Sequence, residues 1–146
     1  MIGTIAQILK ITKEEDLISE FEAFESSLHT ELIELRSKLS QSILSTEAGH
    51  IQQHMAYVEA WRDRVTKYNA LATAFAEHAK SSYFLLPTSK DVKTIEKEAH
   101  QKKLLAGFIG LRTYTEELIK SVDSRVNIAK VLLRVEVGGA TPTTFR

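Results

Sequence analysis

The stretch TSKDVKTIEKEAHQKKLLAGFIGLRTYTEELIKSVDSRVNIAKVLLRVE, residues 88–136, decides the fold of this chain. It contains no proline, and apolar or small residues recur along it at steps of three and four, the spacing of a helix with one buried face. An unbroken helix of this length would extend about 70 Å, which is longer than a compact domain of this size is wide. The helix must therefore either bend at Gly107 and Gly110 or lie along other long helices. The buried stripe is predicted to consist of Val92, Ile95, Ala99, Ala106, Phe108, Leu111, Thr115, Leu118, Val122, Ala129 and Leu132.

Two stretches upstream show the same helical spacing. The first begins near Lys13, where Thr12 and Glu15 fit a capping box. The second is predicted from about residue 47 to residue 82, after a break in residues 42–49, and Pro87 lies in the loop that follows it. In the first stretch the apolar residues repeat every eleven positions, a period that keeps a seam nearly straight along the helix. The repeats are Leu17, Leu28 and Leu39, then Phe21, Leu32 and Ile43, then Phe24 and Leu35.

The sequence therefore predicts an all-α fold, an elongated, coiled-coil-like bundle of two or three long amphipathic helices in a single domain, residues 1–146. Residues 1–11 are expected to form an N-terminal arm or a short helix. Residues 137–146 are expected to be a flexible tail, because Gly138 and Gly139 provide a natural helix stop. Three long apolar stripes leave much surface to cover, so we expect a homo-oligomer. The interface is predicted at Leu17, Phe21, Phe24, Leu28, Leu111, Leu118, Val122, Arg125 and Leu132.

The charge of the chain is unevenly distributed although the 19 basic and 19 acidic residues cancel. Residues 1–50 have a net charge of −5, residues 51–86 of +1 and residues 87–146 of +4. The basic end predicts either an anionic partner or packing of an acidic helix beside a basic one. The absence of cysteine excludes a disulfide framework, and no apolar run is long enough for a membrane span. We expect a cytoplasmic protein without a membrane partner.

No motif for an enzyme or a cofactor occurs in the sequence. His50 and His54 would share a helix face, but no acidic residue lies between them, so a metal site of the H-E-x-x-H type is not expected. The Gly107–Gly110 pair lies inside an apolar helical run, which predicts close helix packing or a bend instead of a nucleic-acid-binding loop. We therefore expect a non-enzymatic protein with no cofactor and no bound metal.

A basic and aromatic cluster is the candidate binding site. Cations that follow a phosphate backbone and aromatic rings that stack on bases are typical of sites for single-stranded nucleic acid. The alternative is a solvated helix start with Phe84 in the core. The predicted nucleic-acid-binding residues are Lys80, Tyr83, Phe84, Lys90, Lys93, Lys97, Lys102 and Lys103.

The run YTEELIKSVDSRVNIAKVLLRVEVGG, residues 114–139, resembles the C-terminal part of the UvsY family of phage recombination mediators, and the resemblance extends over residues 55–139. It implies an oligomer that binds single-stranded DNA and helps a recombinase replace single-strand-binding protein. Where that family has a dense basic and aromatic run at the end of its second helix, this chain has only Lys80 and Tyr83. The matching positions are Tyr114, Leu118, Ile119, Lys120, Arg125, Lys130 and Gly138 or Gly139.

A second hypothesis uses no nucleic acid. The regular eleven-residue seam and the zero net charge are also typical of a coiled-coil protein that acts in phage assembly, in a structural role or against host defence. The two hypotheses share the predicted oligomer and differ in the partner.

Overall fold

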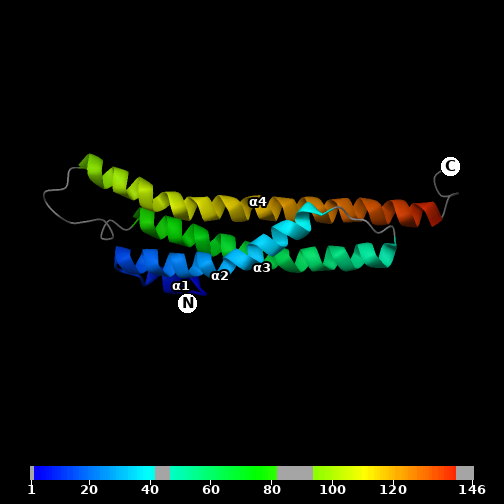
Figure 1. Cartoon of the computed structure of the whole chain (residues 1–146), viewed down its shortest axis with the longest axis horizontal. Helices are drawn as coiled ribbons and strands as arrows, with labels where there is room; N and C mark the ends of the chain where they lie inside the picture. The colour runs from blue at the N-terminus through cyan, green and yellow to red at the C-terminus, as the bar shows by residue number, and fades with distance from the viewer. Residues whose placement is uncertain (1, 42–46, 82–93, 141–146) are drawn as a thin grey trace.

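The computed structural model describes residues 2–41, 47–81 and 94–140, and in these ranges the chain is helical with no strand (Figure 1). The helices are α1 (Ile5–Leu9), α2 (Glu14–Ser40), α3 (Ala48–Ser81) and α4 (Thr94–Ala140). The predicted all-α class is confirmed, as are the three long helices and the break between the first two. The structure adds α1, which takes up part of the predicted N-terminal arm.

The first long helix starts near Lys13 as predicted, but its predicted capping box and the predicted helix stop at Gly138 and Gly139 are wrong. The N-cap of α2 is Lys13, without a side-chain cap, and the capping box lies at α1 instead, where Thr4 Oγ1 accepts from the Gln7 amide at 3.3 Å. The helix stop predicted at Gly138 and Gly139 does not form, because α4 continues to Ala140. Glycine in a helix costs about 1 kcal/mol relative to alanine, which weakens the helix but does not end it. Residues 137–140 are therefore helical and not tail, while residues 141–146 lie outside the described ranges.

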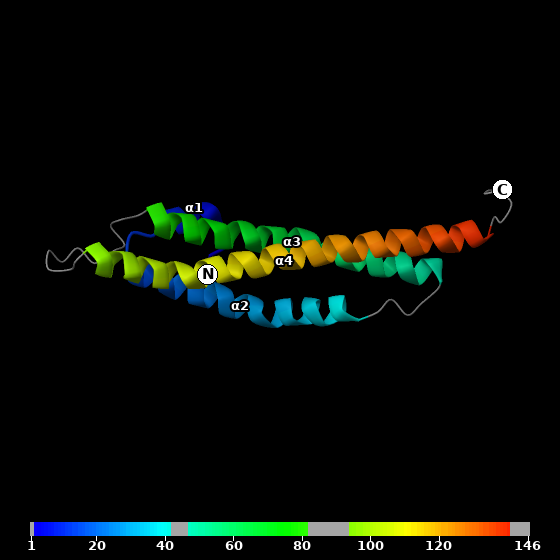
Figure 2. The ribbon, with the colours of Figure 1, turned by 90° about the horizontal axis from the view of Figure 1, so that it is seen from above.

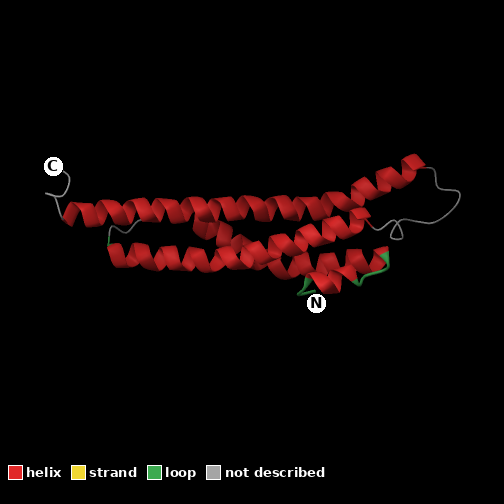
Figure 3. Cartoon of the chain, turned by 180° about the vertical axis from the view of Figure 1, so that it is seen from behind, coloured by secondary structure: helices red, strands yellow, loops and turns green. Residues whose placement is uncertain are grey.

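The three long helices run up, down and up along one axis (Figures 1 and 2). α4 extends along almost the whole molecule, and α3 lies antiparallel beside it. Of the two arrangements expected for such a long helix, the structure therefore shows packing along another long helix. Its first turns tilt away from the rest of the helix (Figures 1 and 3). α2 runs obliquely in the same direction as α4, and α1 packs beside α3 at the N-terminal part of the bundle.

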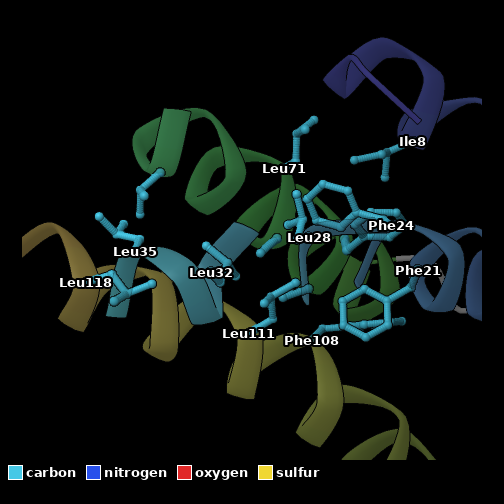
Figure 4. Packing of buried hydrophobic residues seen from close by; sticks show 14 of the residues in the cluster. Ile8, Phe21, Phe24, Leu28, Leu32, Leu35, Leu71, Phe108, Leu111 and Leu118 are labelled. Atoms are coloured by element: carbon cyan, nitrogen blue, oxygen red, sulfur yellow. The ribbon is translucent and has the colours of Figure 1, made fainter. Parts of the chain in front are cut away.

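The core is formed by the apolar stripes of all three long helices (Figure 4). The phenyl rings of Phe21, Phe75 and Phe108, one from each helix, meet with centroids 4.5 Å apart for Phe21–Phe108 and 5.4 Å apart for Phe21–Phe75. Six residues of the predicted eleven-residue repeat are buried, namely Leu17, Phe21, Phe24, Leu28, Leu32 and Leu35, while Leu39 is half-buried and Ile43 lies outside the described residues. In α4, however, Ala99 and Ala106 are exposed, so the predicted stripe is buried only from Phe108 onward in the part whose side chains are described.

Most residues predicted for the oligomer interface lie in this core instead of on a free surface. Three stripes of similar length cover one another in an up-down-up bundle, so periodicity alone did not distinguish the inside of one chain from a contact between chains. Arg125 and Leu132 remain half-buried. The predicted interface residues that are buried within a single chain are Leu17, Phe21, Phe24, Leu28, Leu111, Leu118 and Val122.

The N-terminal segment is held against α3 of its own chain. Ile8 is fully buried, and the His78 ring Nε2 lies 2.8 Å from the carbonyl oxygen of Ile11. Since a carbonyl accepts, Nε2 is the donor in this hydrogen bond. The predicted short helix is therefore an intramolecular contact of the bundle.

The three long helices differ in length, and α2 is too short to cover the other two. With 27, 34 and 47 residues, α2, α3 and α4 extend about 40, 50 and 70 Å. Figures 1 and 2 agree that α2 extends past the middle of the molecule and ends before the N-terminal end of α3 and the C-terminal end of α4, which continue as a helix pair. The bundle thus has a longer three-helix part and a shorter two-helix part.

Candidate helix-binding surfaces

A groove runs between α2 and α4 along the three-helix part. It consists of three hollows of about 460, 420 and 350 Å³. The first two share Glu25, and the last two share Arg36 and Tyr114, so they form one continuous depression, called here the α2–α4 groove. Its α2 wall contains Glu14, Ile18, Phe21, Glu22, Glu25, His29, Leu32, Ile33, Arg36 and Leu39. Its α4 wall contains Lys103, Gly107, Phe108, Gly110, Leu111, Tyr114, Glu117, Leu118 and Ser121.

Gly107 and Gly110 of α4 line this groove with no side chain of their own. A Cβ on Gly107 would lie 3.7 Å from Cε1 of Phe21, an ordinary van der Waals contact, whereas a Cβ on Gly110 would meet no atom within 4 Å. Gly107 thus lies at a helix–helix contact, one of the two roles expected for the glycine pair. Gly110 leaves empty space, and the opposite wall presents Ile33, an isoleucine that is 52% exposed.

The groove has an uneven charge. Glu14, Glu22 and Glu25 line its first hollow together with Lys103, while His29 and Arg36 line the second. α2 as a whole contains eight acidic and two basic residues, a net charge of −6. The groove therefore combines an apolar floor with an acidic wall at the first hollow only, because Arg36 offsets Glu25 at the second.

A second apolar surface lies on the two-helix part. Ile128, Val131 and Val135 are 49%, 53% and 64% exposed, and their steps of three and four place them on one side of α4. We call them the α4 stripe. Arg134 is exposed on the flank of this stripe, whereas the exposed Lys130 lies on another side of α4. Sequence analysis found only the neighbouring Leu132; the signal for the other three was the widening of the apolar face at the end of the helix.

Cations gather where α2 ends against α3 and α4. The Arg125 guanidinium donates a hydrogen bond to the carbonyl oxygen of Leu39, one of the last carbonyls of α2. Burial lowers the pKa of His54, and the charges of Arg125 and Lys38 lower it further. The buried Nε2 of His54 has no hydrogen-bond partner among the described residues. Arg125 therefore holds the end of α2 on the bundle, and the junction disfavours another positive charge.

Two further polar contacts join the helices. Arg62 Nε donates a hydrogen bond to Asp123 Oδ1 at 2.6 Å. This hydrogen bond and the positive charge of Arg62 hold the pKa of the Asp123 carboxyl below its usual range. The Tyr68 hydroxyl donates to Glu31 Oε2 at 2.7 Å. Burial, together with this bond, raises the pKa of Tyr68 to about 12. These pairs fix how α3 is placed between α2 and α4.

The predicted nucleic-acid site is only partly within the described ranges. Lys80, Lys102 and Lys103 are exposed. Glu77 Oε1 on α3 lies 3.7 Å from Arg112 Nη1 on α4. Because the two helices are antiparallel, the end of α3 lies near the part of α4 that contains Lys102 and Lys103. Lys103, however, shares a hollow with three glutamates of α2. Tyr83, Phe84, Lys90 and Lys93 lie outside the described residues, and of Lys97 only the helical backbone is described.

The described ranges contain no group of three His, Cys, Asp or Glu side chains arranged to hold a metal ion. His50 Nδ1 lies 3.4 Å from Glu47 Oε2. The Nε2 of His54 is buried where α2 ends against α3 and α4. Within the same ranges, no helix has the apolar length that a membrane span requires.

Comparisons with protein-family models, with curated proteins and with solved structures give no match for this chain. The resemblance to recombination mediators therefore remains a prediction from the sequence.

Proposed function

We propose that this chain is a non-enzymatic helical assembly protein that associates with further copies of itself. The observation that carries this proposal is the uneven cover of the bundle: α2 ends before α3 and α4 do, and the α4 stripe beyond it is exposed. Contiguous exposed apolar side chains on a helix are typical of a protein-binding surface. Self-association belongs to both sequence-based hypotheses, and we place the second, which uses no nucleic acid, first because three glutamates of α2 line the hollow that contains Lys103.

The described surface is suited to binding helices more than to chemistry. Its hollows are long and lie between helices, and their walls combine apolar side chains with scattered charges. Such grooves accept an amphipathic helix, which buries its apolar face and leaves its charged residues at the rim.

Sedimentation equilibrium over a range of protein concentrations tests this function. We expect a mass above that of one 16.4 kDa chain at tens of micromolar, falling on dilution. A single species of one chain at every concentration would contradict the proposal. The variant Ile128→Glu with Val131→Glu should shift the equilibrium toward the single chain, since both positions are exposed in the chain itself.

Binding of single-stranded DNA is the second candidate function, and the three exposed lysines at one end of the bundle favour it. In the resemblance to recombination mediators, a recombinase and a single-strand-binding protein would be the further partners. The acidic wall beside Lys103 opposes binding of a polyanion, and for this reason we place this function second.

Fluorescence anisotropy with labelled single-stranded DNA at low salt tests it. Changing Lys80, Lys102 and Lys103 to Ala should weaken binding and reduce the slope of log affinity against log salt by about 0.7 for each lost phosphate contact. The control changes Lys10, Lys13 and Lys67, which are exposed elsewhere, and removes the same charge. Equal affinity of both variants would exclude this site, and no binding by the wild type would exclude the function.

A further inference from the structure

We propose that two copies of the chain pair through their α4 stripes, with the two α4 helices antiparallel and related by a two-fold axis. This inference rests on the proposed self-association and specifies its contact. A two-fold contact uses the same surface of both copies, so the assembly closes at two chains.

The α4 stripe continues the side of α4 that α2 covers. Tyr114 and Ser121 line the last hollow of the α2–α4 groove, near the end of α2. Ile128 and Val135 follow them at steps of seven residues, which is close to two helical turns, so all four positions lie on nearly the same side of the helix. Beyond the end of α2 this side is exposed, and its side chains are branched and apolar. A helix placed there would extend the packing of the three-helix part.

The distribution of exposed apolar side chains indicates which surface covers the stripe. In the described ranges, the other large ones occur singly or as a pair on one helix, namely Ile5, Leu9, Ile33, Tyr57 and Ile109. Ile33 shares its hollow with Glu25 and Arg36, so a stripe docked there would also cover charged groups, which costs desolvation free energy. The stripe of a second copy, by contrast, provides a matching series of three apolar side chains.

The position of α2 decides the direction of the pairing. Arg125 donates a hydrogen bond to the carbonyl oxygen of Leu39, so α2 covers α4 as far as this level. In a parallel pair, the part of the second α4 that precedes Arg125 would meet α2. In an antiparallel pair, that part extends beyond the first copy, and the free ends of the two α4 helices, residues 126–140 and about 22 Å each, pack against each other. The antiparallel pair therefore leaves α2 in place.

An axis at the centre of the stripe sets the register. Ile128 and Val135 are about 10 Å apart along α4. In the antiparallel pair, Ile128 of one copy lies beside Val135 of the other, whereas in a parallel pair each of them lies beside its own counterpart. A disulfide requires β-carbons about 4 Å apart, so crosslinking distinguishes the two arrangements.

Disulfide crosslinking is the test, and the chain suits it because it contains no cysteine. Ile128→Cys and Val135→Cys are made separately, and one of them carries an affinity tag. Mild oxidation of an equal mixture should form the mixed disulfide about tenfold faster than either variant crosslinks to itself, because the pair holds the two thiols at a high effective concentration. Lys130→Cys, exposed on another side of α4, gives the rate of chance collisions. Circular dichroism confirms that each variant is folded.

Three results would overturn this pairing and leave self-association intact. Fast crosslinking of Ile128→Cys and of Val135→Cys, each alone, indicates a parallel pair. A mixed disulfide that forms no faster than that of the Lys130→Cys control shows that the stripes do not meet. Species larger than two chains in sedimentation velocity of the wild type exclude a closed pair. A wild type that is a single chain at all concentrations overturns both the pairing and the proposed function.

Discussion

The side-chain amide of Asn69 on α3 donates a hydrogen bond to the hydroxyl of Thr115 on α4 at 3.0 Å, within the interface of the two longest helices. The same amide donates to the carbonyl oxygen of Arg112, also at 3.0 Å. Thr115 is fully buried, and its hydroxyl lies 3.0 Å from the carbonyl oxygen of Leu111. A shift of α3 along α4 by one turn would separate this pair, so it specifies the register of the two helices.

Thr115→Val tests this contribution to stability. The change keeps the shape of the side chain and removes the acceptor for Asn69, so the free energy of unfolding should fall by about 1–2 kcal/mol. Urea denaturation followed by circular dichroism measures it. The matched control is Thr113→Val, two residues away and exposed, which should change stability by less than about 0.5 kcal/mol. Equal stability of the two variants would show that the hydrogen bond contributes nothing net.

Phe75 is the central ring of the core. It is fully buried, and its centroid lies 5.4 Å from that of Phe21, 5.7 Å from that of Phe24 and 5.8 Å from that of Phe108. Phe75→Ala should lower the free energy of unfolding by about 3–5 kcal/mol, since it leaves a cavity at the point where the three long helices meet. Phe75→Leu, which refills most of that space, should cost clearly less. If both variants lose under about 1 kcal/mol, the ring does not join the helices as described.

Gly110→Ala should stabilise the protein. Gly110 lies inside a helix without a positive φ, and an added Cβ meets no atom within 4 Å. The gain should be about 0.5–1 kcal/mol, because alanine restricts the unfolded chain and favours the helix. Gly49→Ala, in the first turn of α3, is the comparison and should give a smaller gain at the frayed helix end. A lower melting temperature for Gly110→Ala would show that the helix needs glycine there for its path.

His54 should make stability depend on pH. Its pKa in the folded protein is lowered from 6.5, so below that pH the unfolded chain binds more protons than the folded one. Stability is therefore highest above about pH 6.5 and falls as the pH decreases toward the pKa of the folded state. Urea denaturation from about pH 8 to about pH 5 should show this loss in the wild type.

His54→Gln is the matched variant for this pH dependence. It cannot become charged beside Arg125 and Lys38, so its stability should fall less over the same pH range. The other histidines are common to both proteins, and the difference between the two curves belongs to His54. Parallel curves would contradict a role for His54 at this junction.

The sequence by itself determined the helices. The steps of three and four in residues 88–136 predicted α4, and the eleven-residue repeat from Leu17 predicted the buried face of α2, because the period of apolar residues is a local property of the chain. The sequence did not determine the end of α4. Gly138 and Gly139, the predicted stop, lie within the helix, because a glycine weakens a helix without ending it.

The tertiary structure decided which apolar stripe packs against which other helix. Leu17 and Val122 were predicted to face another subunit, and both are buried by their own chain, because an apolar stripe does not specify its partner. The same arrangement leaves Ile128, Val131 and Val135 exposed on α4 beyond the end of α2. It also leaves the groove over Gly110, a space that depends on the separation and tilt of two helices far apart in sequence. These surfaces follow from how the helices pack and from their unequal lengths, which the spacing of residues along one helix does not contain.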